Sequence, residues 1–110
     1  DVNAGVPHGF FRGMHPLFAA AFRGHIKVMQ ALVQSKADAN LPISGTIAKG
    51  VSSLHFAAFM GQSEAALCLL DANCEIDLKI SAGLTKGATA LTAAAFGGMN
   101  DTIQVLLKRQ

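Results

Sequence analysis

Residues 16–35, which read PLFAAAFRGHIKVMQALVQS, decide the fold. In the first half, Leu17, Ala20 and Ala21 share one helical face, and Gly24 follows where a left-handed or tight turn would end a helix. The second half predicts an amphipathic helix with a continuous apolar stripe. The residues of that stripe are Val28, Met29, Leu32 and Val33. The stretch therefore predicts two short helices joined at a glycine.

The same pattern returns twice at a step of 37 residues without a gap, as Leu17, Leu54 and Leu91 show. We call residues related by this step a column. Seven columns are identical in all three copies, and in first-copy numbers they are Gly13, Leu17, Ala20, Ala21, Phe22, Gly24 and Leu32. Because 110 residues are too few for two ordinary cores, we expect one array. Its repeats would span about residues 1–37, 38–74 and 75–110.

The segment before each helix pair has a different pattern. Residues 40–50 read NLPISGTIAKG, in which Ile43 and Ile47 flank a turn-forming Ser-Gly-Thr sequence. This arrangement is typical of a hairpin that projects from the helices, and we call the projection a finger.

These residues resemble the ankyrin repeat family over essentially the whole chain. The matching segments in the first copy are His15-Pro16-Leu17-Phe18, Ala20-Ala21, Gly24-His25, Leu32-Val33 and Asp38-Ala39-Asn40. Later copies offer Ser52-Ser53-Leu54-His55 and Thr89-Ala90-Leu91-Thr92. The resemblance implies a mainly all-α solenoid of helix-turn-helix pairs. Because the period exceeds the family's usual length of about 33 residues, we expect long β-hairpin fingers.

Composition and motifs exclude several functions. The net charge of +2 is small for a nucleic-acid binder, and no apolar run approaches the roughly 20 residues of a membrane span. There is no phosphate loop, Cys-x-x-Cys, His-Glu-x-x-His or nucleophile elbow. The histidines, His8, His15, His25 and His55, lack metal-ligand spacing, although His8 and His15 could approach each other across a finger. The resemblance implies that single histidines make local hydrogen bonds, a role that His25 and His55 fit by position. The sequence thus indicates no enzyme, no cofactor and no metal site.

The remaining candidates for a functional site are columns of residues on the surface. Phe22, Phe59 and Phe96 would form an apolar docking groove on the first helices, or alternatively pack between neighbouring repeats. Phe56 and Met60 would widen this groove in the second copy, and Arg23 and Gly97 would border its two ends.

Two further columns lie on the fingers. Arg12, Lys49 and Lys86 would form a basic row that steers an acidic partner, or are simply solvated. Phe10, Ile47 and Leu84 would be apolar finger tips that contact a partner, or shield one another.

The resemblance implies a protein-binding scaffold or adaptor that holds a partner protein on its concave face and fingers. The alternative is a structural or accessory subunit of a larger assembly, because neither end of the array resembles a polar cap. We expect further repeats of a longer parent chain, or a partner, at one end at least. Cytoplasm or nucleus is the default location, and an organelle if Asp1 is a processed N-terminus.

Overall fold

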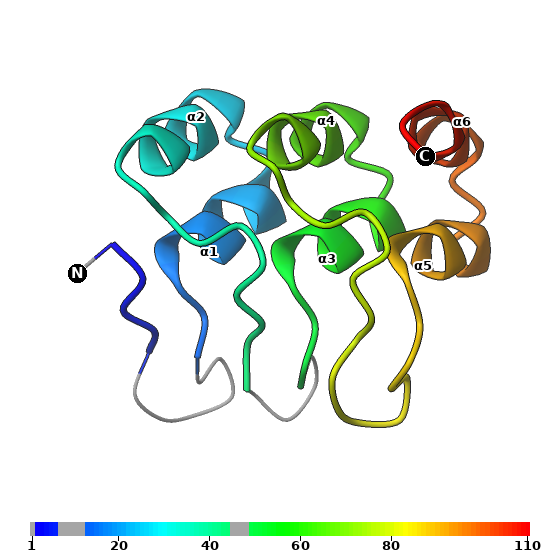
Figure 1. Ribbon diagram of the computed structural model, residues 1–110, viewed down its shortest axis with the longest axis horizontal. Helices are drawn as coiled ribbons and strands as arrows, with labels where there is room; N and C mark the ends of the chain where they lie inside the picture. The colour runs from blue at the N-terminus through cyan, green and yellow to red at the C-terminus, as the bar shows by residue number, and fades with distance from the viewer. Residues whose placement is uncertain (1, 7–12, 45–48) are drawn as a thin grey trace.

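The computed structural model describes residues 2–6, 13–44 and 49–110, and these form six helices in two layers (Figure 1). The layer beside the fingers holds α1 (Pro16–Arg23), α3 (Ser53–Phe59) and α5 (Ala90–Phe96). The outer layer holds α2 (Ile26–Gln34), α4 (Ser63–Asp71) and α6 (Asn100–Lys108). The three helix pairs that the sequence predicts are therefore confirmed.

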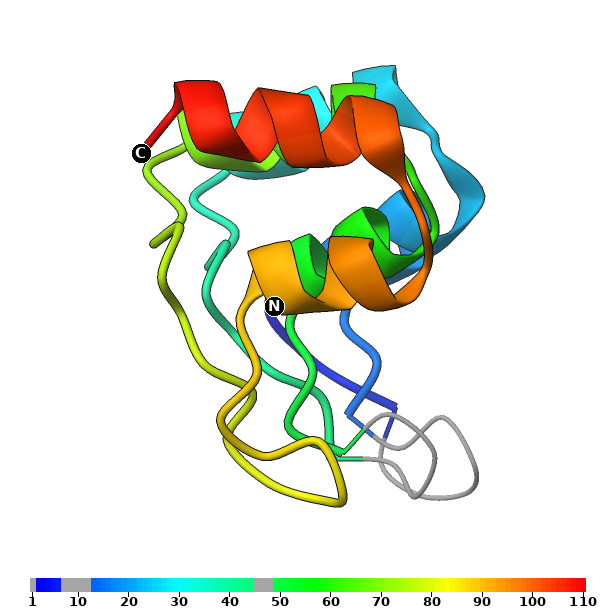
Figure 2. The ribbon, with the colours of Figure 1, turned by 90° about the vertical axis from the view of Figure 1, so that its right-hand side faces the viewer.

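Small side chains let the first helices lie close together. Ala57 and Ala58 of α3 are fully buried between α1 and α5, and Leu54 of the same helix is buried with them. Met29 and Leu69 fill the space between the two layers. Viewed from the side, the layers form a narrow stack from which the fingers extend past the first helices (Figure 2). The packed alanine columns thus set the distance from one repeat to the next.

The base of each finger is closed by the same pair of backbone hydrogen bonds. In the second finger the Ile43 amide donates to the Val51 carbonyl at 3.0 Å, and the Gly50 amide donates to the Ile43 carbonyl at 2.7 Å. Ile43 thus faces two residues, Gly50 and Val51, as in a β-bulge whose first residue is a glycine of positive φ. Gly50 has a φ of 79°. The same bonds join Val6 to Gly13 and Met14, and Ile80 to Gly87 and Ala88.

Neighbouring fingers meet along their backbones at this glycine. The Ser81 amide donates to the Gly50 carbonyl at 3.3 Å, and a Cβ on Gly50 would lie 2.5 Å from the Ala82 amide nitrogen. Gly13 faces Ser44 in the same way. Around Gly87, by contrast, no atom of the described residues lies within 4 Å of the position of a Cβ. The glycine column therefore provides both the bulge and the contact between fingers.

The long β-hairpins that we expected for the fingers are not found in the described residues. These residues contain no strand, and their only bridge joins Pro42 to Ser52. In the third finger, the Lys86 and Ala88 amides donate to carbonyls three residues earlier, at Gly83 and Thr85. Local turns thus use the backbone groups that a ladder would need.

Gly50→Ala and Gly87→Ala should separate these two roles of the glycine. Both variants should lose about 1–2 kcal/mol of unfolding free energy, because each alanine would adopt a positive φ. Gly50→Ala should lose roughly 1–3 kcal/mol more, because its Cβ would collide with the next finger. Urea unfolding followed by circular dichroism measures both losses, and equal losses would contradict the finger contact.

Ser53→Ala should stabilise the chain. The Ser53 hydroxyl is buried without a hydrogen-bond partner in the described structure, and alanine already occupies this column at Ala90. Removing it should raise the unfolding free energy by about 1 kcal/mol. The matched control is Ser63→Ala, which should lower it by a similar amount. The Ser63 hydroxyl lies 2.8 Å from that of the buried Thr102, which would lose its partner.

Candidate functional site

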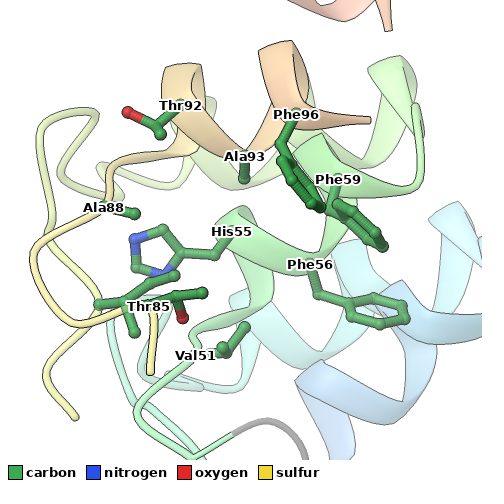
Figure 3. A pocket seen from close by; sticks show the side chains of 10 residues that line it. Val51, His55, Phe56, Phe59, Thr85, Ala88, Thr92, Ala93 and Phe96 are labelled. Atoms are coloured by element: carbon green, nitrogen blue, oxygen red, sulfur yellow. The ribbon is translucent and has the colours of Figure 1, made fainter. Parts of the chain in front are cut away.

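An apolar groove of about 390 Å³ opens between α3, α5 and the bases of the second and third fingers (Figure 3). The rings of Phe56, Phe59 and Phe96 lie along one side, and His55 lies toward the fingers. The remaining lining residues are Val51, Ile80, Thr85, Ala88, Thr92 and Ala93. Such a concave, mostly apolar surface is suited to a hydrophobic side chain of a partner.

The groove exists because the third repeat carries small residues where the second carries rings. Phe56 and Ala93 share a column, as do His55 and Thr92. Phe56 stacks on Phe22 of the preceding repeat, with ring centroids 4.9 Å apart and planes 8° apart. Ala93 cannot cover Phe59 in this way. The hollow therefore occupies the space that an aromatic ring fills one repeat earlier.

The phenylalanine column is neither fully buried nor fully free. Phe22 and Phe59 are 42% and 40% exposed, whereas Phe96 is 85% exposed. Phe59 stacks on Phe96 with centroids 6.1 Å apart. Each ring thus packs on one face, as in the packing alternative, and offers its remaining surface to solvent. The role of that surface in docking stays a prediction.

His55 fixes the finger side of the groove. Its Nε2 lies 2.6 Å from the Leu78 carbonyl, to which it donates, and its Nδ1 accepts the Ser52 amide at 3.0 Å. The neutral ring satisfies both bonds, because one nitrogen donates and the other accepts. Burial lowers the pKa of His55, and the hydrogen bond to Leu78 opposes this shift in part. His55 is therefore held in its neutral form.

His15, which belongs to a different column, makes the equivalent hydrogen bond in the first repeat. Its Nε2 lies 2.9 Å from the Leu41 carbonyl, and Leu41 and Leu78 share a column. Burial lowers the pKa of His15, while the Leu41 bond and the charge of Asp38 act in the opposite direction. The structural role expected for His55 is confirmed. His25, for which the same role was expected, is exposed and makes no side-chain cap bond to α2.

The other predicted partner-binding residues surround the groove or lie apart from it. Arg23 and Met60 are exposed at the C-terminal ends of α1 and α3. Lys49 and Lys86 are exposed on the fingers, and Leu84 of the third finger is completely exposed. In the described residues no neighbouring finger shields Leu84. Three predicted residues lie outside the described part of the chain, and they are Phe10, Arg12 and Ile47.

Sequence reasoning missed most of the small residues of the groove. Ala93 and Thr92 line the groove, but an alanine in a helix predicts close packing and gives no sign of a hollow. The available signal is the comparison within one column, where Phe56 is followed by Ala93. Val51 and Ala88 could have been found in the same way, because each directly follows the bulge glycine of its finger.

Among the described residues, no group of three or more His, Cys, Asp and Glu side chains gathers as a metal site. Burial, with the charges of Glu75 and Asp38, raises the pKa of the Cys74 thiol to about 12, so this thiol stays protonated at neutral pH. Cys68 is half-buried beside the core. None of the described helices is long and apolar enough to cross a membrane.

The fold is that of a solenoid of stacked helix pairs with an open groove beside the fingers. The family model for ankyrin repeats, in three copies, matches residues 1–80, and the chain belongs to the ankyrin repeat family. No curated protein matches the chain. Ankyrin repeats are generally protein–protein interaction modules and are typically not enzymes.

Folding stability should fall as the pH drops below about 6.5. His15 and His55 have lowered pKa values in the folded chain, so the unfolded chain binds protons first and is stabilised relative to the folded one. Above that pH both rings are neutral in both states, and their contribution is complete. Urea unfolding at about pH 7.5 and about pH 5.5 measures the change. His55→Gln should reduce it, and His25→Gln, at an exposed position, is the control.

Proposed function

We propose that this chain is a scaffold or adaptor module that holds a partner protein on the finger side of α3 and α5. The observation that carries the proposal is the groove itself, which is apolar, open to solvent and bordered by exposed aromatic rings. Aromatic residues at the centre of a concave apolar surface are typical of the residues that dominate binding energy. The family's general role in protein binding supports this assignment.

The basic residues Lys49 and Lys86 and the exposed Leu84 extend the proposed surface onto the fingers. They stand close in the chain to the groove residues Val51 and Thr85. We expect the groove to supply most of the affinity, because exposed charges contribute little to it.

Filling the groove should abolish binding without harming the fold. Ala93→Phe would place a ring against Phe59 as Phe56 is placed against Phe22. Phe96→Ala should weaken binding by on the order of 2 kcal/mol, as expected for an aromatic anchor. It should cost little stability, because the Phe96 side chain is mostly exposed. Quantitative affinity capture from cell extract, with urea unfolding of each variant, measures both effects.

The control is Leu107→Ala, which removes an exposed apolar side chain of α6 that does not line the groove. A protein captured equally by the original chain, Ala93→Phe and Leu107→Ala would not be bound through the groove, and the proposal would fail.

A specific observation also favours the alternative function, a structural subunit of a larger assembly. Ala21 and Ala58 are completely buried against the next repeat, whereas Ala95 of the same column is exposed. Leu107 is exposed as well, while Leu70 of its column is buried. The face of the third repeat that points away from the second repeat thus offers an apolar surface of the kind that the other repeats bury. Light scattering distinguishes the two functions, because a stable monomer supports the module and aggregation or obligate association supports the subunit.

A further inference from the structure

The charges of the chain are divided between its two sides. The fingers and first helices, over residues 4–24, 41–61 and 78–98, contain five basic residues and no Asp or Glu. The remaining segments contain four basic residues and all seven acids. The small net charge of +2 therefore conceals a basic side and an acidic side.

This division follows the architecture. The described parts of the segments without acids form the finger bases and the layer of α1, α3 and α5, whereas the described acids lie on the second helices and the turns that follow them (Figure 1). On the outer side, Arg109 forms an ion pair with Asp71 at 2.9 Å. The basic side chains of the groove side have no such partner among the described residues. They are Arg23, Lys49, Lys79 and Lys86.

Two of these basic residues are close in the chain to residues that line the groove. Lys49 stands two residues before Val51, and Lys86 lies in the chain between Thr85 and Ala88, all of which line the groove. Lys49 also lies against the third finger. A Cβ added to Gly83 of that finger would lie 3.8 Å from the Cβ of Lys49. An apolar hollow with cations on the adjoining fingers is complementary to an apolar side chain flanked by carboxylates.

We infer that the partner bound in this groove presents an acidic segment around a bulky apolar side chain, an assignment that rests on the proposed function. The apolar side chain enters the space beside Ala93, and the flanking carboxylates lie toward Lys49 and Lys86. Charge attraction speeds the encounter and selects against basic segments, while the groove supplies most of the affinity.

A single-stranded nucleic acid is the competing occupant, because basic surfaces with exposed rings also bind unstacked bases. The shape of the site favours the acidic protein segment. The groove is a hollow lined almost entirely by apolar side chains, whereas nucleic acid needs a continuous basic track.

The test is a selection from a random peptide library on the immobilised chain, with Ala93→Phe as the counter-selection. We expect binders with a bulky apolar residue among Asp and Glu. For a selected peptide, the double variant Lys49→Glu, Lys86→Glu should raise Kd on the order of tenfold at low salt, and the effect should shrink in about 0.5 M salt. The control Lys27→Glu, Lys108→Glu makes the same change of net charge on the outer side and should leave Kd unchanged.

The outcomes separate this inference from the function on which it rests. If no binder depends on an open groove, the proposed function fails. If binders depend on it but are neutral or basic, or respond equally to both double variants, only the acidic-segment inference is overturned. Tighter binding of a uridine or thymidine oligonucleotide, lost in the Lys49 and Lys86 double variant, would overturn it in favour of nucleic acid.

Discussion

The distance between neighbouring repeats constrains everything else in this structure. It is set in the helices by Ala57 and Ala58, which are completely buried, and in the fingers by the backbone contact between Gly50 and Ala82. Side chains at these positions cannot grow without separating the repeats. Because the spacing is fixed, an aromatic ring on one repeat reaches the ring on the next, and a missing ring leaves a hollow of defined size.

Hydrogen bonds between repeats recur at equivalent backbone positions, but the side chains that make them can come from different columns. The Asn3 and Asn40 side chains accept backbone amides of the next repeat, at Asp38 and Glu75. The carbonyl column of Leu41 and Leu78 is bonded by imidazoles that come from two different columns. What the fold requires is a donor at that carbonyl, since an unpaired buried group costs more than a hydrogen bond contributes. The residue that supplies the donor is free to change.

The helices could be predicted closely from the sequence, because Leu, Ala and Gly recur there in both the helical period and the repeat period. The fingers could not, because the Ile43 and Ile47 pattern favours a ladder, while local turns such as that from Gly83 to Lys86 compete for the same amides. Of the groove, the rings Phe56, Phe59 and Phe96 were identified as candidates. The hollow itself was not predicted, because it arises where the third repeat has a small side chain, Ala93, in place of a ring.

That origin of the hollow has an evolutionary consequence. The columns that hold the repeats together are identical in all three copies, whereas the column of His55 takes a different residue in each and the column of Phe56 holds alanine in the other two copies. Substitutions in these columns, such as the change from Phe56 to Ala93, can therefore alter the binding specificity with little loss of the stability on which tolerance to mutation depends. A duplicated or exchanged repeat would carry its own hollow to a new place in the array, so that specificity is inherited one repeat at a time.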